Sequence, residues 1–138
     1  MLPPVALIVF NRPDLVKKQV ENLQRTAIKQ LFIIADGPRA INDDDKRCRE
    51  VRQIIDNVNW RCDVNKSYAE SNMGCANRIV SGINWVFTMV DRAVILEDDC
   101  LAHPSMFEFC GELLERYRDQ DKVMHICGTQ PFKKYNFL

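Results

Sequence analysis

The sequence lacks a surplus of charge of either sign. Its 138 residues include 19 Lys and Arg and 19 Asp and Glu, which cancel. No overall field therefore draws the protein to nucleic acid or to an anionic membrane, and we expect no nucleic-acid partner. An anionic ligand has to be bound by local groups.

Long apolar runs and metal-type cysteine spacings are also lacking. The longest early apolar run, residues 5–10, is far shorter than the roughly 20 residues that span a bilayer. No basic leader with a small-residue cleavage site is present. The six cysteines contain no CxxC pair or other zinc-like spacing, so we expect free thiols rather than a disulfide scaffold. These features predict a cytoplasmic protein without a membrane span in this chain.

What the sequence does contain is an alternation of strand-like and helix-like segments, and 46% of its residues are apolar, which is enough for one core. Runs rich in branched apolar residues predict strands at residues 5–10, 31–35, 63–68, 93–96 and 123–127. Segments of helical period predict helices that start at Pro13, cover residues 43–58, follow Gly74 and start at Pro104. The order predicts an α/β fold with an open, mostly parallel sheet and helices on both faces. We expect a single domain over residues 1–138.

Polar side chains follow the first two predicted strands, where parallel sheets bind ligands. Asn11 and Arg12 come after the first strand, at the start of a helix. Asn11 is a good helix N-cap, and Arg12 either lies in solvent or grips a phosphate at the helix N-terminus. Asp36 comes after the second strand and before a Gly-Pro turn. It is either a turn residue or an acceptor for a base or ribose.

Two further polar segments precede predicted helices. Before the third helix, Asn72 is a candidate N-cap and Gly74 permits close approach of the backbone to a ligand. Arg78 lies in the first helical turn, where the helix dipole disfavours a cation, so it is either matched by a negative partner or an ordinary surface arginine. The acidic run at residues 43–45 opens a helix and is followed by Lys46, which predicts a solvated helix start.

The most informative stretch is the end of the fourth strand. Glu97, Asp98 and Asp99 follow an apolar run directly. Adjacent acids repel one another and lose solvation when buried, so a cationic partner is expected. If the extended path persists, Glu97 and Asp99 face one way and Asp98 the other. One or two carboxylates with a substrate diphosphate suit Mg²⁺ or Mn²⁺. The alternative is that these acids cap the next helix or form salt bridges.

Four motifs, taken together, resemble the donor-binding half of GT-A glycosyltransferases. They are VALIVFNRP, IIADG, NMGCANR and ILEDDC, the last of which is followed by PSMFEF. The resemblance is to the family 2 type and, more closely, to the N-acetylglucosaminyltransferase I-like group. It implies a nucleotide-sugar donor, with a UDP-sugar favoured, a glycan or other hydroxyl acceptor, and Mn²⁺ or Mg²⁺.

The resemblance also implies roles for individual residues. Arg12 would contact the donor diphosphate, Asp36 the uracil or ribose, Arg78 the nucleotide or phosphate, and Asp98 the ribose or sugar, while Asp99 would bind the metal. The remaining donor-binding residues would be Phe10, Asn11, Asn72 and Glu97. The acceptor half of such enzymes, with its catalytic carboxylate, has no counterpart after Gly128. We therefore expect that the catalytic base lies outside this chain and that the chain alone transfers little or no sugar.

Two other functions are compatible with the sequence. A sugar-1-phosphate nucleotidyltransferase shares the sheet and the metal, but it needs a glycine-rich basic loop after the first strand, and here that loop is Asn-Arg-Pro-Asp. A non-catalytic nucleotide-sugar-binding module is the second alternative. The sequence leaves open whether the chain forms a homo-oligomer.

Overall fold

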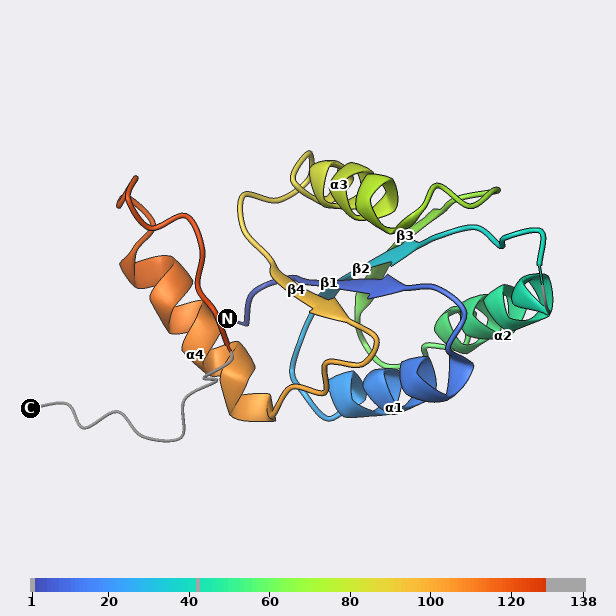
Figure 1. Cartoon of the computed structure of the whole chain (residues 1–138). Coiled ribbons are helices and arrows are strands. Elements are labelled where there is room, and N and C mark those ends of the chain that lie inside the picture. Colours follow the sequence, from blue (N-terminus) through green and yellow to red (C-terminus); the bar gives the residue numbers. More distant parts are fainter. Residues whose placement is uncertain (1, 42, 129–138) are drawn as a thin grey trace, which may run out of the picture.

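The computed structural model describes residues 2–41 and 43–128. Along the chain lie β1 (Val5–Val9), α1 (Pro13–Gln24), β2 (Gln30–Ala35), α2 (Asp44–Asp56), β3 (Asp63–Tyr68), α3 (Cys75–Val86), β4 (Val94–Glu97) and α4 (Pro104–Arg116). Strands and helices alternate throughout, as Figure 1 shows. The predicted α/β class is confirmed, and the predicted helices begin within a residue or two of their observed starts.

The four strands form one parallel sheet in the order β3-β2-β1-β4. The chain moves outward from β1 through β2 to β3, and then returns to place β4 on the other side of β1. The strand order therefore changes direction between β1 and β4. In open sheets of this kind, ligands bind outside the carboxyl ends of the strands, near the point where the strand order changes direction.

Helices cover both faces of the sheet, as predicted (Figure 1). On one face, alternate strand residues such as Val5 and Leu7 pack with residues of α1, α2 and α4. On the other face, Ala6, Phe32 and Ile34 pack with α3. A Cβ atom at Gly82 of α3 would lie 2.3 Å from the Ile34 Cγ2 atom, so the close packing of α3 on β2 depends on this glycine.

The predicted fifth strand at residues 123–127 is wrong. This segment has no strand structure, and Met124 is 94% exposed. His125 in this segment is exposed too. The apolar run was a sound strand signal, but a strand also needs a partner edge for its backbone hydrogen bonds. Here the segment lies beside Leu114 of α4 and the following Tyr117 instead of pairing with the outer edge of β4.

Two expectations about the whole chain can be compared with the described residues. None of the helices in residues 2–41 and 43–128 has the length and apolar character needed to cross a bilayer. The side chains of Cys48, Cys62, Cys75, Cys100 and Cys110 are free thiols, as expected from their spacing. Burial raises the pKa of the Cys48 and Cys110 thiols, which favours inert structural roles for both.

Candidate functional site: the strand ends of β1 and β4

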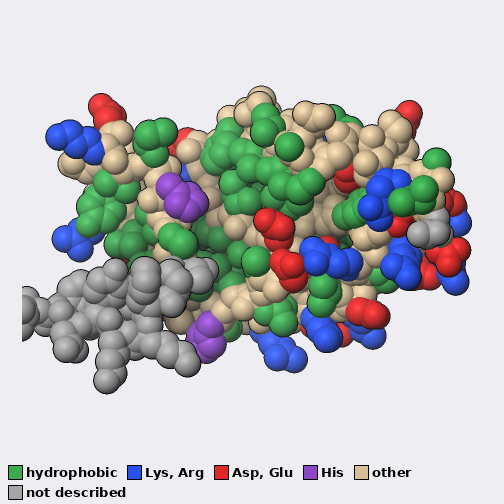
Figure 2. Space-filling model, viewed as in Figure 1, with side chains coloured by type: hydrophobic (Ala, Val, Ile, Leu, Met, Phe, Trp, Pro, Cys, Tyr) green, Lys and Arg blue, Asp and Glu red, His purple; other side chains and the backbone are tan. Residues whose placement is uncertain are grey.

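The loops after β1 and β4 meet at the carboxyl edge of the sheet. Ile8 of β1 is the register partner of Glu97 of β4, so residues just beyond each strand are neighbours in space. This brings Arg12 beside Asp98 and Asp99, which are more than 80 residues further along the chain. Together with Glu97 they form what we call the strand-end site. Figure 2 shows acidic and basic side chains side by side here, next to an apolar area.

Arg12 is the cationic partner that the acidic run requires. Its Nε donates to Asp98 Oδ2 at 3.2 Å, its Nη2 donates to Asp98 Oδ1, and its Nη1 donates to Asp99 Oδ2 at 3.0 Å. One guanidinium thus makes a bidentate contact with Asp98 and also hydrogen-bonds to Asp99. Of the alternatives that the sequence left open, the structure shows salt bridges for these acids.

The acids of the strand-end site differ sharply in exposure. The Asp98 side chain is 2% exposed and the Asp99 side chain 48%. Burial raises the pKa of Asp98; Arg12 opposes this rise, while the charges of Asp99 and Glu97 add to it. The hydrogen bond from Arg12 lowers the pKa of Asp99. The strand-end site therefore holds more negative charge than one guanidinium balances.

The chain does not stay extended through these acids. The Cys100 N–H donates to the Glu97 carbonyl oxygen at 3.0 Å, which closes a turn over Asp98 and Asp99. Burial still alternates as predicted, because Glu97 and Asp99 are exposed and Asp98 is buried. The turn aims the exposed carboxylate of Asp99 toward Arg12.

A buried glutamine, which the sequence analysis missed, holds this turn. Gln19 of α1 is fully buried, and its Nε2 donates to the carbonyl oxygens of Cys100 at 2.8 Å and Glu97 at 3.4 Å. Asn22, one turn later, donates to the Ala102 carbonyl oxygen at 2.8 Å. The signal was present, because Gln19 lies between Val16 and Leu23 on the apolar face of α1, where a polar residue needs a partner.

A second ion pair lies beside the loop after β1. Arg39 binds Asp44 through Nε–Oδ2 at 2.6 Å and Nη2–Oδ1 at 3.3 Å, and Asn11 donates to the same carboxylate at 2.6 Å. Arg39 also lies over the Phe10 ring, with its guanidinium carbon 5.2 Å from the ring centroid. Asn11 therefore does not cap α1, whose N-cap residue is Arg12. The predicted solvated start of α2 is wrong for Asp44, which is buried in this contact.

Asp36 joins the loop after β2 to the loop before α3. Its carboxylate accepts hydrogen bonds from the backbone N–H groups of Gly37 at 2.8 Å and Met73 at 2.9 Å, and from Asn72 Nδ2 at 3.0 Å. A Cβ atom at Gly37 would lie 2.4 Å from the Ser71 carbonyl carbon, so the two loops are in tight contact. Asn72 is not the N-cap of α3, since that position is Gly74, at φ +80°.

Arg78 is buried, so it is not the ordinary surface arginine that the sequence also allowed. It donates to backbone oxygens at the ends of two strands, from Nε to the Ala35 carbonyl at 3.1 Å and from Nη2 to the Ser67 carbonyl, and also from Nη2 to Ser67 Oγ at 2.8 Å. Burial lowers its pKa, and the charge of Asp36 opposes that change. Its hydrogen-bond partners in the structure are neutral carbonyl and hydroxyl oxygens rather than an acidic side chain.

The predicted site residues thus fall into two groups along one edge of the sheet. Arg12, Glu97, Asp98 and Asp99 lie together at β1 and β4, with Phe10 and Asn11 in the adjoining loop. Asp36, Asn72 and Arg78 lie at the ends of β2 and β3 and are bound to each other or to backbone.

The donor set of the strand-end site suits one kind of metal. Among the described residues, no three acidic, histidine or cysteine side chains are grouped as a metal centre. The exposed carboxylate of Asp99 is a hard oxygen ligand, which fits Mg²⁺ or Mn²⁺ when a diphosphate and water supply the other oxygens. The residues present therefore fit a substrate-completed site and not an all-protein cage.

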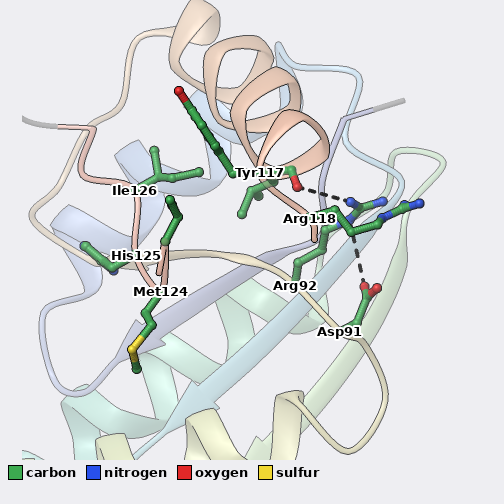
Figure 3. Close-up of a pocket in the computed structure, with 9 residues that line it drawn as sticks. Asp91, Arg92, Tyr117, Arg118, Met124, His125 and Ile126 are labelled. Atoms are coloured by element: carbon green, nitrogen blue, oxygen red, sulfur yellow. Dashed lines mark hydrogen bonds and ion pairs between the residues drawn. The ribbon is translucent and has the colours of Figure 1, made fainter. Parts of the chain in front are cut away.

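A hollow of about 270 Å³ lies at the opposite end of the sheet (Figure 3). It is lined by the turn at Asp91 and Arg92, the last turn of α4 and residues 123–126. Arg92 donates to the Leu114 carbonyl oxygen at 3.5 Å and pairs with Glu115 at 2.9 Å. None of the predicted site residues lines it.

In comparisons with known proteins, no family model, no curated protein and no solved structure matches this chain. The functional assignment therefore depends on the chemistry of the strand ends and on the resemblance of the four motifs.

Proposed function

We propose that this chain is the donor-binding domain of a metal-dependent glycosyltransferase. It binds a nucleoside-diphosphate sugar, with a UDP-sugar favoured, for transfer of the sugar to a glycan or another hydroxyl acceptor. The observation that carries the proposal is the meeting of Arg12, Asp98 and Asp99 between β1 and β4, the point where the strand order changes direction. Open parallel sheets bind nucleotides outside the carboxyl ends of their strands, near such a point.

Arg12 and Asp99 have distinct tasks under this proposal. The Arg12 side chain is 46% exposed, so its guanidinium is accessible to phosphate oxygens at the start of α1. Asp99 would hold Mn²⁺ or Mg²⁺, which when bound neutralises negative charge on the leaving diphosphate. Asp98 stays buried and positions Arg12.

The second group of residues would border the nucleoside. Asp36 already accepts three hydrogen bonds from its own chain, which favours a role in fixing the loop at residues 71–74 over direct contact with the base. Arg78 fixes the ends of β2 and β3 beneath that loop. Phe10 offers a ring next to this region, although Arg39 lies over it.

The acceptor hydroxyl has to lose a proton to a general base. Among the described acids of the strand-end site, Glu97 is exposed and makes no ion pair, so it is the first candidate if the chain proves active alone.

A metal-independent nucleotide-sugar-binding module is the second candidate function. The observation that favours it is the Arg12 grip on Asp98 and Asp99, which already supplies a cation to the acids.

A thermal-shift series tests the proposal. The chain is heated with UDP-sugars, GDP-sugars, UDP or uridine, each with and without Mn²⁺. A ligand that binds the folded state raises its melting temperature according to RT ln(1 + [L]/Kd). We expect the largest shift with a UDP-sugar and Mn²⁺ together. A shift that Mn²⁺ does not change would favour the metal-independent module, and no shift with any nucleotide would contradict both functions.

A further inference from the structure

Arg12 holds three of the four carboxylate oxygens of Asp98 and Asp99. Its three hydrogen bonds go to both oxygens of Asp98 and to Asp99 Oδ2. Within residues 2–41 and 43–128, Arg12 is the only side chain that pairs with Asp98. The acids and their internal cation thus form a closed unit in the absence of ligand.

We infer that Arg12 is a built-in counter-ion with which a divalent cation competes for Asp99, so that metal and diphosphate bind cooperatively. The inference builds on the proposed function, from which it takes the diphosphate. A guanidinium and a divalent cation repel each other, and both are attracted to the Asp99 carboxylate. The metal alone therefore binds weakly, because the charge of Arg12 remains beside it.

A diphosphate removes this obstacle. Phosphate oxygens accept the same bidentate hydrogen bonds from arginine as a carboxylate does. Once Arg12 turns toward the diphosphate, Asp99 is released for the metal. By thermodynamic linkage, the metal raises the affinity for the diphosphate by the same factor as the diphosphate raises the affinity for the metal.

The geometry allows this movement without disturbing the helix. The Arg12 carbonyl oxygen accepts the Val16 N–H at 3.1 Å and belongs to the first turn of α1, whereas the side chain is 46% exposed. The acids are held independently, because Gln19 fixes the turn that carries them.

The chain contains a matched ion pair that serves as a control. Arg39 and Asp44 have side chains 48% and 4% exposed, against 46% and 2% for Arg12 and Asp98. Both pairs lie at the same edge of the sheet. The Asp44 carboxylate, however, also receives Asn11, and it is not flanked by an acid that shares its arginine.

Calorimetric titration with Mn²⁺ alone tests the competition. The full chain, Arg12→Gln and Arg39→Gln are compared at one pH and ionic strength. Arg12→Gln is expected to bind Mn²⁺ about 5- to 150-fold more tightly than the unchanged chain, the range typical of coupled sites. Arg39→Gln removes the same charge nearby and should leave the affinity unchanged. The double variant Arg12→Gln, Asp99→Asn should bind Mn²⁺ as weakly as the unchanged chain does.

Arg12→Lys provides a second variant in case Arg12→Gln does not fold, as judged by circular dichroism. Lysine keeps the charge but cannot make the bidentate contact with Asp98. The Mn²⁺ affinity should therefore rise by a smaller factor than in Arg12→Gln. Equal or weaker Mn²⁺ binding by the folded Arg12 variants overturns the inference, and so does an equal increase in Arg39→Gln.

A third series separates this inference from the proposed function. Mn²⁺ is titrated in the presence of UDP or uridine. UDP, but not uridine, should tighten Mn²⁺ binding in the unchanged chain, and by a smaller factor in Arg12→Gln, where the diphosphate still offers oxygens to the metal but no longer draws away a competing cation. If UDP has no effect while Arg12→Gln still binds Mn²⁺ more tightly, the counter-ion role stands and the nucleotide function fails. If UDP tightens Mn²⁺ binding equally in both chains, the function stands and the counter-ion role fails.

Discussion

The two arginine–aspartate pairs at the carboxyl edge of the sheet have nearly the same exposure but different electrostatics. At Asp44, a hydrogen bond from Arg39 and, to a smaller extent, one from Asn11 lower the pKa of the carboxylate. These hydrogen bonds satisfy the carboxylate within the protein. At Asp98, burial raises the pKa, and the charges of Asp99 and Glu97 add to that rise against the effect of Arg12. The first pair is a completed structural contact, whereas the second retains unbalanced negative charge.

This difference supports the proposal that the strand-end site binds a ligand. Carboxylates whose pKa values are perturbed by burial and by like charges are often found at functional sites. Ion pairs such as Arg39 with Asp44 anchor loops. Here that pair joins the loop after β2 to the start of α2 and, through Asn11, to the loop after β1.

The largest expected effect comes from the exposed carboxylate. Asp99→Ala should abolish the part of UDP-sugar affinity that depends on Mn²⁺, because Asp99 is the proposed metal ligand. Asp45→Ala is the control, since Asp45 is also exposed and bound to an arginine, Arg49, in the first turn of α2. Calorimetric titration of UDP-sugar with and without Mn²⁺ measures both. Metal-dependent binding that survives Asp99→Ala would remove Asp99 from the site.

The arginines of the two pairs should differ in their effect on nucleotide binding. Arg12→Ala should weaken UDP binding by about 2 kcal/mol, within the range for a hydrogen bond to a charged group, and leave uridine nearly unaffected. Arg39→Ala should change neither ligand by a comparable amount. Equal losses for UDP and uridine in Arg12→Ala would place Arg12 away from the phosphates.

The fold was largely predictable from the sequence because apolar runs and helical periods are local signals. The strand order was not predictable, since no local feature of β4 indicates that it pairs with β1. The segment at residues 123–127 shows the same limit, because its pattern favours a strand but its position against α4 leaves it unpaired.

The candidate site was predictable in its residues but not in their partners. Arg12 and the acids of residues 97–99 were each identified from their positions after strands, yet their mutual salt bridges link distant parts of the chain. Asp44 was misjudged for the same reason. Its sequence neighbours suggested solvent, whereas its partners Asn11 and Arg39 come from other loops.

The third prediction concerns how the Arg39–Asp44 ion pair makes the stability of the protein depend on pH. The folded-state pKa of Asp44 is lowered, so its ionised form stabilises the protein above the unfolded-state pKa of about 4 and loses that effect as the pH falls through the lower folded-state value. Asp44→Asn should therefore be less stable than the unchanged chain at neutral pH. The gap should narrow below about pH 4.

Urea unfolding at several pH values measures this gap. A difference between the two proteins that stays constant from neutral to acidic pH would show that Asp44 contributes through packing and not through its charge.

The smallest expected effect concerns the turn that carries the acids. Gln19→Leu removes the hydrogen bonds to the Glu97 and Cys100 carbonyls, and should lower the free energy of unfolding by about 1 kcal/mol, the usual net value of such bonds. Mn²⁺-dependent UDP affinity should fall as well, because the turn is less firmly placed. A loss of stability without any loss of affinity would show that Gln19 supports the fold alone.

The most direct test of the account is a crystal structure of the chain with UDP and Mn²⁺, in which the anomalous signal of manganese locates the metal. We predict a manganese peak on the Asp99 carboxylate, the diphosphate at the carboxyl ends of β1 and β4, and Arg12 turned from Asp99 toward the phosphates. A nucleotide bound elsewhere, such as in the hollow beside α4, or a diphosphate at these strand ends with no manganese at Asp99, would contradict it.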